Sequence, residues 1–357
     1  MATSHLSFNN GFVLSLDAHG GDAAPRVVVE GIEWFLKHEG EGQRARFLLH
    51  GDEAQLAPLL RKNPRCRERS EIRHTTATIS GDMAPSQAIR RGKGSSMWNA
   101  ISSVKGGEAL VAVSAGNTGA LMGMSKLQLR MKPGVQRPAI AAIWPTTAGR
   151  SVVLDVGANI EVDAAQLTEF AVLGEAYYRA LFKRPCPTVG LLNVGTEELK
   201  GNATIKLAHE RLRDSELDLK YIGYVEGSDI ARGRADVVVT DGFTGNIALK
   251  TAEGTASMIG GMFDQALKGN VWSKFTTALN SYALLNLRKK LDPRRVNGGV
   301  MLGLNGIVVK SHGGTDKVGF ANALGVAIDL ARSDFQTEIT RRLEELHVED
   351  ENLGFLA

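Results

Sequence analysis

The chain has 357 residues, of which 43% are hydrophobic and 23% are charged, with 40 glycines. This composition is typical of a globular α/β protein with many tight turns, long enough for one large or two medium domains. The formal net charge of +3, from 42 basic and 39 acidic residues, is too balanced to indicate nucleic-acid binding. The two cysteines, Cys66 and Cys186, stand in no CxxC pair or metal-ligand cluster, which argues against a disulfide framework and a zinc site.

The amino-terminal residues 1–11 are polar and lack the apolar core of a signal peptide. We expect them to be disordered. No apolar run approaches the length of a membrane-spanning helix. Together with the low cysteine content, this predicts a cytoplasmic protein, without excluding contact with a membrane surface.

The first half of the chain alternates apolar strands with helical segments. Strands are predicted over residues 12–16, 45–50, 71–75 and 109–113, and helices over 25–37, 84–91, 95–104 and 122–131. Two further strands, 139–144 and 151–155, are joined by a short polar turn and predict an antiparallel hairpin.

The second half continues the alternation. Its clearest element is a helix over 163–182, for which Asp163 is a good N-cap. Further strands are predicted over 188–192, 219–225, 235–240, 300–304 and 307–310, and further helices over 203–213, 247–267, 272–290, 316–332 and 334–346. The alternation predicts an α/β fold with a doubly wound, mostly parallel sheet. No Pro-rich or Ser-rich linker interrupts residues 12–333, which favours two lobes sharing one sheet, with a helical tip over 255–297 and a carboxy-terminal helix and tail over 334–357.

Polar, glycine-containing turns follow six of the predicted strands. They are Asp17–Asp22, Ser114–Gly119, Asp155–Asn159, Asn193–Glu197, Asp241–Asn246 and His312–Gly314. In a doubly wound sheet the carboxyl ends of parallel strands lie along one rim, where ligands bind, so the six turns predict one cleft. At the turn that starts with Ser114, free N–H groups and the helix dipole would favour an anion.

Several kinds of chemistry are not indicated. The chain has no GxxxxGK[ST] loop, no GxSxG elbow, no GxGxxG fingerprint, and neither HExxH nor EF-hand spacing. We therefore expect no metal and no cofactor. Many amide donors, several Asn side chains and a few lysines suit phosphate binding and stabilisation of an oxyanion without a covalent enzyme intermediate.

Individual polar residues have alternative interpretations. His312 is either a general base or phosphate donor, or an ordinary polar group of a loop. Lys200 can reach an anion or simply neutralise its acidic neighbours, and the functional interpretation is favoured. Asn117 is predicted to act in catalysis. Asp17 and Asp22 are better explained as residues that orient their loop through hydrogen bonds to the backbone.

The segment Trp272–Arg295 is more apolar than a surface helix requires and ends in a basic cluster. An apolar face beside basic residues is suited to docking on anionic lipid. Burial against a second subunit is the favoured alternative, and both can hold.

Taken together, these segments resemble the phosphate acyltransferase (PlsX) family of bacterial phospholipid synthesis. The matching segments, in the order of the family, are 17–22, 94–97, 114–122, 137–138, 154–159, 190–195, 200–201, 224–227, 241–246 and 312–313. The resemblance implies a homodimeric enzyme, with a fold similar to phosphotransacetylases and isocitrate-type dehydrogenases, that uses inorganic phosphate to cleave the thioester of an acyl-acyl carrier protein. The acyl phosphate formed would feed a membrane glycerol-3-phosphate acyltransferase.

The site residues follow from the matching segments. The catalytic candidates are Asn117, Lys200 and His312. The substrate-binding candidates are Gly20, Gly21, Asp22, Ser114, Gly116, Thr118, Gly119, Asp155, Gly157, Asn159, Asn193, Gly195, Asp241, Gly242, Phe243 and Asn246. The chain departs from the family at His19, where Met is common, and at Gly313–Thr315, where a Ser-rich turn is usual.

Three other functions remain as alternatives at this stage. One is a phosphotransacetylase that uses acyl-CoA. Another is a metal- and NAD-dependent hydroxyacid dehydrogenase, which rests on fold analogy alone. The third is a non-enzymatic membrane scaffold built on Trp272–Arg295.

Overall fold

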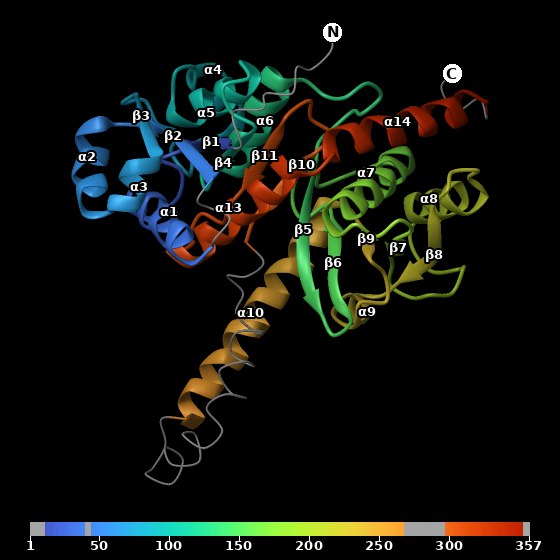
Figure 1. Cartoon of the computed structure of the whole chain (residues 1–357). Helices are drawn as coiled ribbons and strands as arrows, with labels where there is room; N and C mark the ends of the chain where they lie inside the picture. Colours follow the sequence, from blue (N-terminus) through green and yellow to red (C-terminus); the bar gives the residue numbers. More distant parts are fainter. Residues whose placement is uncertain (1–10, 40–43, 268–296, 353–357) are drawn as a thin grey trace.

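The strands that the structure describes form one sheet through the centre of the molecule (Figure 1). The computed structural model describes residues 11–39, 44–267 and 297–352. The sheet is 11-stranded, in the order β3-β2-β1-β4-β11-β10-β5-β6-β9-β7-β8. The strands are β1 Phe12–Asp17, β2 Ala45–Gly51, β3 Ser70–His74, β4 Val111–Ser114, β5 Ala139–Thr146, β6 Gly149–Leu154, β7 Thr188–Leu192, β8 Lys220–Val225, β9 Val237–Val239, β10 Gly299–Leu302 and β11 Ile307–Lys310.

The sheet consists of two parallel blocks that run in opposite directions. The first block is β3, β2, β1, β4 and β11, and the second is β6, β9, β7 and β8. Between them, β10 is antiparallel to β11 and to β5, and β5 is antiparallel to β6. The predicted α/β fold with a mostly parallel sheet is confirmed. The expectation that all strand-end turns share one rim is wrong, because the second block is reversed.

The register nevertheless brings the carboxyl ends of the two blocks to the same level. Val300 of β10 pairs with Val309 of β11 on one side and with Ala141 of β5 on the other. Ala141 also pairs with Leu154, the last residue of β6, while β11 ends one residue after Val309, at Lys310. The strands of the two blocks therefore run toward each other's ends from opposite sides of the sheet. The turns at their carboxyl ends meet across β10 and β5.

Helices cover both faces of the sheet (Figure 1). They are α1 Arg26–His38, α2 Glu53–Lys62, α3 Pro64–Arg69, α4 Pro85–Arg91, α5 Ser96–Lys105, α6 Thr118–Leu129, α7 Ala164–Phe182, α8 Ala203–Asp214, α9 Gly227–Arg232, α10 Gly242–Leu267, α13 Lys317–Arg332 and α14 Phe335–Asn352. On one face, α1, α13, α7 and α14 bury residues such as Ile32, Phe320 and Phe170 in the larger core. On the other face, α4, α5 and α6 form a second core around Leu121, with Leu249 of α10 at its margin.

Local sequence accounts for most of these elements. All four residues of β4 are buried, as a parallel strand covered on both faces requires. Asp163 and Gln166 form a capping box at the start of α7, in which each side chain accepts from the other's backbone N–H at 2.8 and 3.0 Å. The predicted hairpin is β5–β6. Each predicted strand lies within two residues of an observed one.

The differences concern helices with weak local signals. The sequence does not predict α2, α3 or α9. Helix α2 contains Pro58, although its cap is regular: Asp52 accepts from the N–H of Ala54 at 3.0 Å. Helices α6 and α10 begin earlier than predicted, at Thr118 and Gly242, because their glycine-containing first turns look like loop in the sequence.

Helix α10 projects away from the sheet (Figure 1). Several predictions lie outside the described residues: the disorder of residues 1–10, the helix over 272–290 and the segment Trp272–Arg295. The predicted tip over 255–297 is described only up to Leu267 and at residue 297. Within the described parts of the chain, no helix is long and apolar enough to cross a membrane.

Candidate active site

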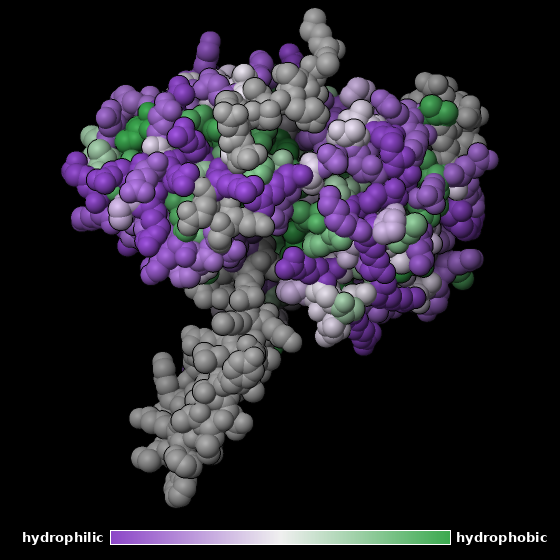
Figure 2. Space-filling view, in the orientation of Figure 1, coloured by the Kyte–Doolittle hydropathy of each residue, from purple (hydrophilic) through white to green (hydrophobic). Residues whose placement is uncertain are grey.

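A cavity of about 720 Å³, here called the central cavity, lies where the two blocks of the sheet meet. Ile140 of β5 and Gly299 of β10 form part of its floor. Thr118 at the start of α6, Asn246 in the first turns of α10 and His312 after β11 stand around it. In the space-filling view, hydrophobic residues are visible between two halves whose surface is otherwise mostly hydrophilic (Figure 2).

Hydrogen bonds hold the turns after β1, β4 and β11 together. Asp17 accepts from the hydroxyls of Ser96 and Ser114 at 2.6 and 2.7 Å. The N–H of Asp22 donates to the carbonyl of Gly313 at 2.9 Å. Burial raises the pKa of Asp17, while its hydroxyl donors act in the opposite direction. Asp17 thus orients the turns through a backbone hydrogen bond at His19 and through the two serine side chains.

Gly20 occupies a place in this network with no room for a side chain. A Cβ on Gly20 would lie 2.5 Å from Oδ2 of Asp17 and 2.7 Å from the backbone nitrogen of Gly116. The hydroxyl of Ser114 accepts from the N–H of that same Gly116 at 3.0 Å. These residues therefore build the wall behind the central cavity.

The side chain of Asn117 is engaged in hydrogen bonds at the start of α6, and its catalytic role stays a prediction. Its Oδ1 accepts from the N–H of Ala120 at 2.9 Å, which caps α6. Its Nδ2 donates to the carbonyls of Gly81 and Met83 at 2.7 and 3.2 Å. Because both amide hydrogens and the carbonyl are engaged, the side chain positions α6, whose Thr118 lines the cavity.

Asp155 is an internal brace at the end of β6. Its Oδ1 accepts from the N–H groups of Gly157, Ala158 and Ile140 at 3.2, 2.9 and 3.1 Å. Its Oδ2 accepts from the backbone and side-chain nitrogens of Asn159 at 2.7 and 2.8 Å. Burial raises the pKa of Asp155 and these donors counteract it. The carboxylate fixes the turn that brings Gly157 to the cavity.

Helix α10 begins in close contact with this turn. The N–H of Gly242 donates to the carbonyl of Asn159 at 2.7 Å. A Cβ on Gly245 would lie only 2.0 Å from the carbonyl oxygen of Asp155, so only glycine fits. This contact sets the position of Asn246, which lines the cavity from the next residue.

Two predicted binding residues near the start of α10, Asp241 and Phe243, do not line the central cavity. Asp241 accepts from the N–H and the hydroxyl of Thr244, each at 2.7 Å, and so caps the helix. Phe243 is 59% exposed and is not among the residues that line the cavity.

The turn after β7 stays apart from the central cavity. Strand β9 separates β7 from β6 in the sheet. Asn193 uses its side chain to bond the carbonyl of Lys200 at 3.2 Å, and the Lys200 side chain is exposed. Neither these residues nor Gly195 lines the cavity, so the catalytic role of Lys200 remains a prediction.

His312 and Lys250 place two hydrogen-bond donors against each other. Gly314 donates its N–H to Nδ1 of His312 at 3.1 Å. A neutral ring then carries its hydrogen on Nε2, which lies 3.0 Å from Nζ of Lys250. Burial and the nearby lysine lower the pKa of His312, which favours that neutral form. Two donors that face each other this closely would be stabilised by an anion that accepts from both.

Four charged residues of the cavity were not predicted as site residues: Lys250, Glu253, Lys310 and Asp316. Lys250 follows Asn246 by one helical turn, a spacing that places both on one face of α10. It pairs with Glu253 at 2.7 Å. Lys310 is the last residue of the otherwise apolar strand β11. A lysine at the end of an apolar strand was the feature of the sequence that could have indicated its place in the site. Burial lowers the pKa of Lys310 to about 8.

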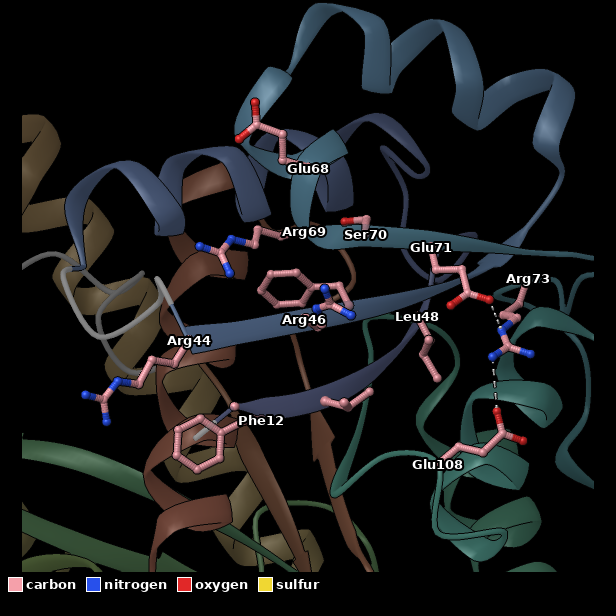
Figure 3. A pocket seen from close by; sticks show the side chains of 13 residues that line it. Phe12, Arg44, Arg46, Leu48, Glu68, Arg69, Ser70, Glu71, Arg73 and Glu108 are labelled. Atoms are coloured by element: carbon pink, nitrogen blue, oxygen red, sulfur yellow. Dashed lines mark ion pairs between the residues drawn. The ribbon is translucent and has the colours of Figure 1, made fainter. Parts of the chain in front are cut away.

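A second groove, of about 850 Å³, lies at the amino-terminal ends of β1, β2 and β3 (Figure 3). Its best-defined contacts are ion pairs of Arg73 with Glu71 at 2.9 Å and with Glu108 at 3.4 Å. No predicted site residue lines it, and no strand-end turn of the second block reaches it. Although this groove is larger, the central cavity is the candidate active site because the turns of both blocks converge there.

The predicted site residues divide into three groups. Those that line the central cavity are Thr118, Gly157, Asn246 and His312. Those in the turns packed next to it are Gly20, Gly21, Asp22, Ser114, Gly116, Asn117, Gly119, Asp155, Asn159, Asp241 and Gly242. Those that do not line it and project elsewhere are Asn193, Gly195, Lys200 and Phe243. Within residues 11–39, 44–267 and 297–352, no group of three or more His, Cys, Asp and Glu side chains is arranged to hold a metal ion.

The chain is similar to known proteins over nearly its whole length. Residues 12–338 match the profile of a family described as "Fatty acid synthesis protein". A phosphate acyltransferase of Maricaulis maris is 56% identical over 333 residues, which cover 93% of this chain and 95% of that protein. A phosphate acyltransferase of Caulobacter vibrioides is 54% identical, over 94% of this chain and 92% of that protein.

Solved structures share the fold at low sequence identity. A phosphotransacetylase from Streptococcus pyogenes aligns with a TM-score of 0.60 and 19% identity, covering 90% of this chain and 94% of that one. A 4-hydroxythreonine-4-phosphate dehydrogenase from Klebsiella pneumoniae aligns with a TM-score of 0.53 and 12% identity, covering 90% and 98%. Since acyltransferases and dehydrogenases both adopt this fold, the likeness identifies the architecture and not the reaction.

Proposed function

This chain belongs to the fatty acid synthesis protein family, whose similar members are named phosphate acyltransferases, and we propose that it transfers an acyl group from an acyl-acyl carrier protein to inorganic phosphate. The products are an acyl phosphate and free carrier protein, and the pathway is phospholipid biosynthesis. The enzyme is an acyltransferase that needs no cofactor for this reaction.

The observation that carries the proposal is the pair of donors at His312 and Lys250. Nε2 of His312 and Nζ of Lys250 lie 3.0 Å apart at the edge of a cavity that Lys310 also lines. Phosphate offers oxygens that accept from both donors at once and carries the negative charge that the lysines attract. Holding phosphate in this way raises its effective concentration beside an acyl group.

The same cavity also offers an apolar wall. Ile140, Ala142, Val156 and Leu249 line it next to the donors. A thioester with a fatty chain needs apolar surface for the chain and polar donors at the reacting carbonyl. In the reaction, a phosphate oxygen attacks the thioester carbon, the carbonyl oxygen gains negative charge, and the carbon–sulfur bond then breaks. The donors of His312 and Lys250, held in advance by Gly314 and α10, fix the attacking phosphate beside the thioester.

The test measures thiol release from a long-chain acyl-acyl carrier protein. We expect free carrier thiol to appear only when phosphate is present, together with one equivalent of acyl phosphate. The variant His312→Gln should raise the KM for phosphate, whereas Lys206→Gln, a change on helix α8 outside the cavity, should not. Thiol release that does not depend on phosphate would overturn the proposal, and a clear preference for acetyl-CoA would favour a phosphotransacetylase instead.

Three partners are part of the proposal. The enzyme takes its substrate from acyl carrier protein, works as a homodimer and passes a reactive acyl phosphate to a membrane glycerol-3-phosphate acyltransferase. Peripheral contact with the inner face of the cell membrane through Trp272–Arg295, which lies outside the described residues, would keep the product near that consumer. Sedimentation of the full chain with anionic and neutral vesicles tests the contact, and equal binding to both would contradict its basic component.

A further inference from the structure

Lys310 occupies the level of the sheet where the two blocks end. It is the last residue of β11, it pairs with Gly299 of β10, and both line the central cavity. Its Nζ donates to the carbonyl of Ser311 and lies 3.5 Å from the carbonyl of Ala115. An ammonium group has three N–H bonds, so at least one remains for a ligand in the cavity.

Charged groups of both signs surround Lys310. Two acidic residues, Asp17 at the end of β1 and Asp22 in the turn after it, raise the pKa of the lysine. Two others, Glu253 on α10 and Asp316 at the start of α13, line the cavity. The basic ones are Lys250 of α10, which lowers the pKa, and His312 in the turn that follows β11. The Lys310 ammonium therefore lies near charges of both signs, and none of the contacts described above pairs it directly with a carboxylate.

The proposed reaction requires a proton to move. Hydrogen phosphate carries one hydrogen, and its attack on the thioester forms an oxygen–carbon bond while the carbon–sulfur bond breaks. The sulfur leaves as a thiolate and ends as a thiol, whereas the phosphate hydrogen is lost as the acyl phosphate forms. The net change is the transfer of one proton from phosphate to sulfur, and a group between the two would make this transfer direct.

We propose that Lys310 relays this proton, giving an N–H hydrogen to the sulfur as the carbon–sulfur bond breaks and taking the phosphate hydrogen as the acyl phosphate forms. The inference rests on the proposed function. Lys310 returns to its ammonium form in each turnover, so no other reactant is needed. His312 does not fill this role, because Gly314 holds its Nδ1 and its Nε2–H is a donor toward the anion.

The acidity of the group suits the task. Burial lowers the pKa of Lys310 to about 8, close to the value of about 8.5 for an ordinary thiol. Proton transfer between groups of similar pKa carries little energetic cost in either direction. An unperturbed lysine, at about 10.4, would be a poorer donor to sulfur.

The experiment compares Lys310→Arg with wild type on two thioesters. Arginine keeps the positive charge but does not release a proton near neutral pH. With acyl-acyl carrier protein we expect kcat to fall by ~10²–10⁴-fold, the usual contribution of general acid catalysis, with the phosphate KM changed by less than ~3-fold. With an aryl thioester, whose thiol leaves without protonation, we expect the loss of kcat to shrink to below ~10-fold, since Brønsted behaviour reduces the advantage of an acid.

Two further measurements keep the outcome unambiguous. Lys317→Arg, at an exposed position that begins α13, is the matched control and should leave kcat with both thioesters unchanged. Wild-type kcat should decrease above pH about 8, as the ammonium form is lost, and this decrease should be absent in Lys310→Arg. An equal loss on both thioesters, or no loss, would overturn the relay while leaving the acyltransferase reaction intact. A wild-type enzyme that forms no acyl phosphate would instead overturn the proposed function.

Discussion

Replacing Asp155 by asparagine should destabilise this protein although the two side chains have nearly the same size. The Asp155 side chain is fully buried. Its two oxygens accept five hydrogen bonds, three at Oδ1 and two at Oδ2, all from N–H donors of residues 140 and 157–159.

The magnitude follows from these contacts. In asparagine, one of the two oxygens becomes an NH₂ group, so two or three of the buried donors face another donor. Each such donor left without an acceptor costs ~1–3 kcal/mol, so Asp155→Asn should lower the free energy of unfolding by ~2–9 kcal/mol. Because the same turn places Gly157 at the cavity, the phosphate KM should also rise.

Urea denaturation at pH 7, followed by circular dichroism, measures the change. Asp163→Asn is the matched control, since Asp163 caps α7 at a surface position and asparagine is an equally good N-cap. We expect the control to stay within ~0.5 kcal/mol of wild type. If Asp155→Asn were equally close to wild type, the carboxylate would not be the brace of this turn.

Three further predictions concern stability. Burial lowers the pKa of His50 from 6.5 to about 4, so the unfolded chain binds a proton at this residue before the folded chain does as pH falls. The free energy of unfolding should therefore decrease by up to about 3 kcal/mol between pH 7 and 4. Paired urea titrations of wild type and His50→Gln should show that the variant lacks this decrease. Gly245→Ala would place a methyl group 2.0 Å from a backbone carbonyl oxygen, so it should lower the free energy of unfolding by ~3 kcal/mol or more and reduce activity. Gly254→Ala, in open space on the same helix, should raise the free energy of unfolding by ~0.5–1 kcal/mol. Similar melting temperatures for the two variants would contradict this. Glu175→Ala removes one of the two carboxylates paired with Arg342, whose side chain is 2% exposed and keeps its pair with Glu345. The change should cost ~1–3 kcal/mol by the same urea assay, whereas a cost below ~1 kcal/mol, as for an exposed ion pair, would contradict this.

Some features of the site followed from local sequence patterns. Apolar runs bounded by polar, glycine-containing turns located the strands, and the turns after β4, β6, β9 and β11 do meet around the cavity. Asp163 ahead of an apolar periodic segment marked the start of α7. His312 and Asn246 were predicted as site residues because they stand in the polar, glycine-containing turns that follow strands.

Other features required distant contacts. Asn117 and Asp155 looked like ligand-binding groups, since a sequence shows which residues can donate or accept but not which partners already engage them. Lys250 and Lys310 were overlooked because neither stands beside glycine in a turn. Their proximity to His312 depends on how α10 packs against β6 and on where β11 ends.

By itself, the sequence determined the strands and most of the helices, the family and the polar character of the strand ends, because side-chain periodicity, capping and turn chemistry act over a few residues. Only the tertiary structure decided that the two parallel blocks run in opposite directions and that their carboxyl ends meet across β10 and β5. Strand direction is set by pairing between segments far apart in the chain, and no local pattern encodes it. The same pairing places Lys310 at the cavity, where burial shifts its acidity toward that of a thiol.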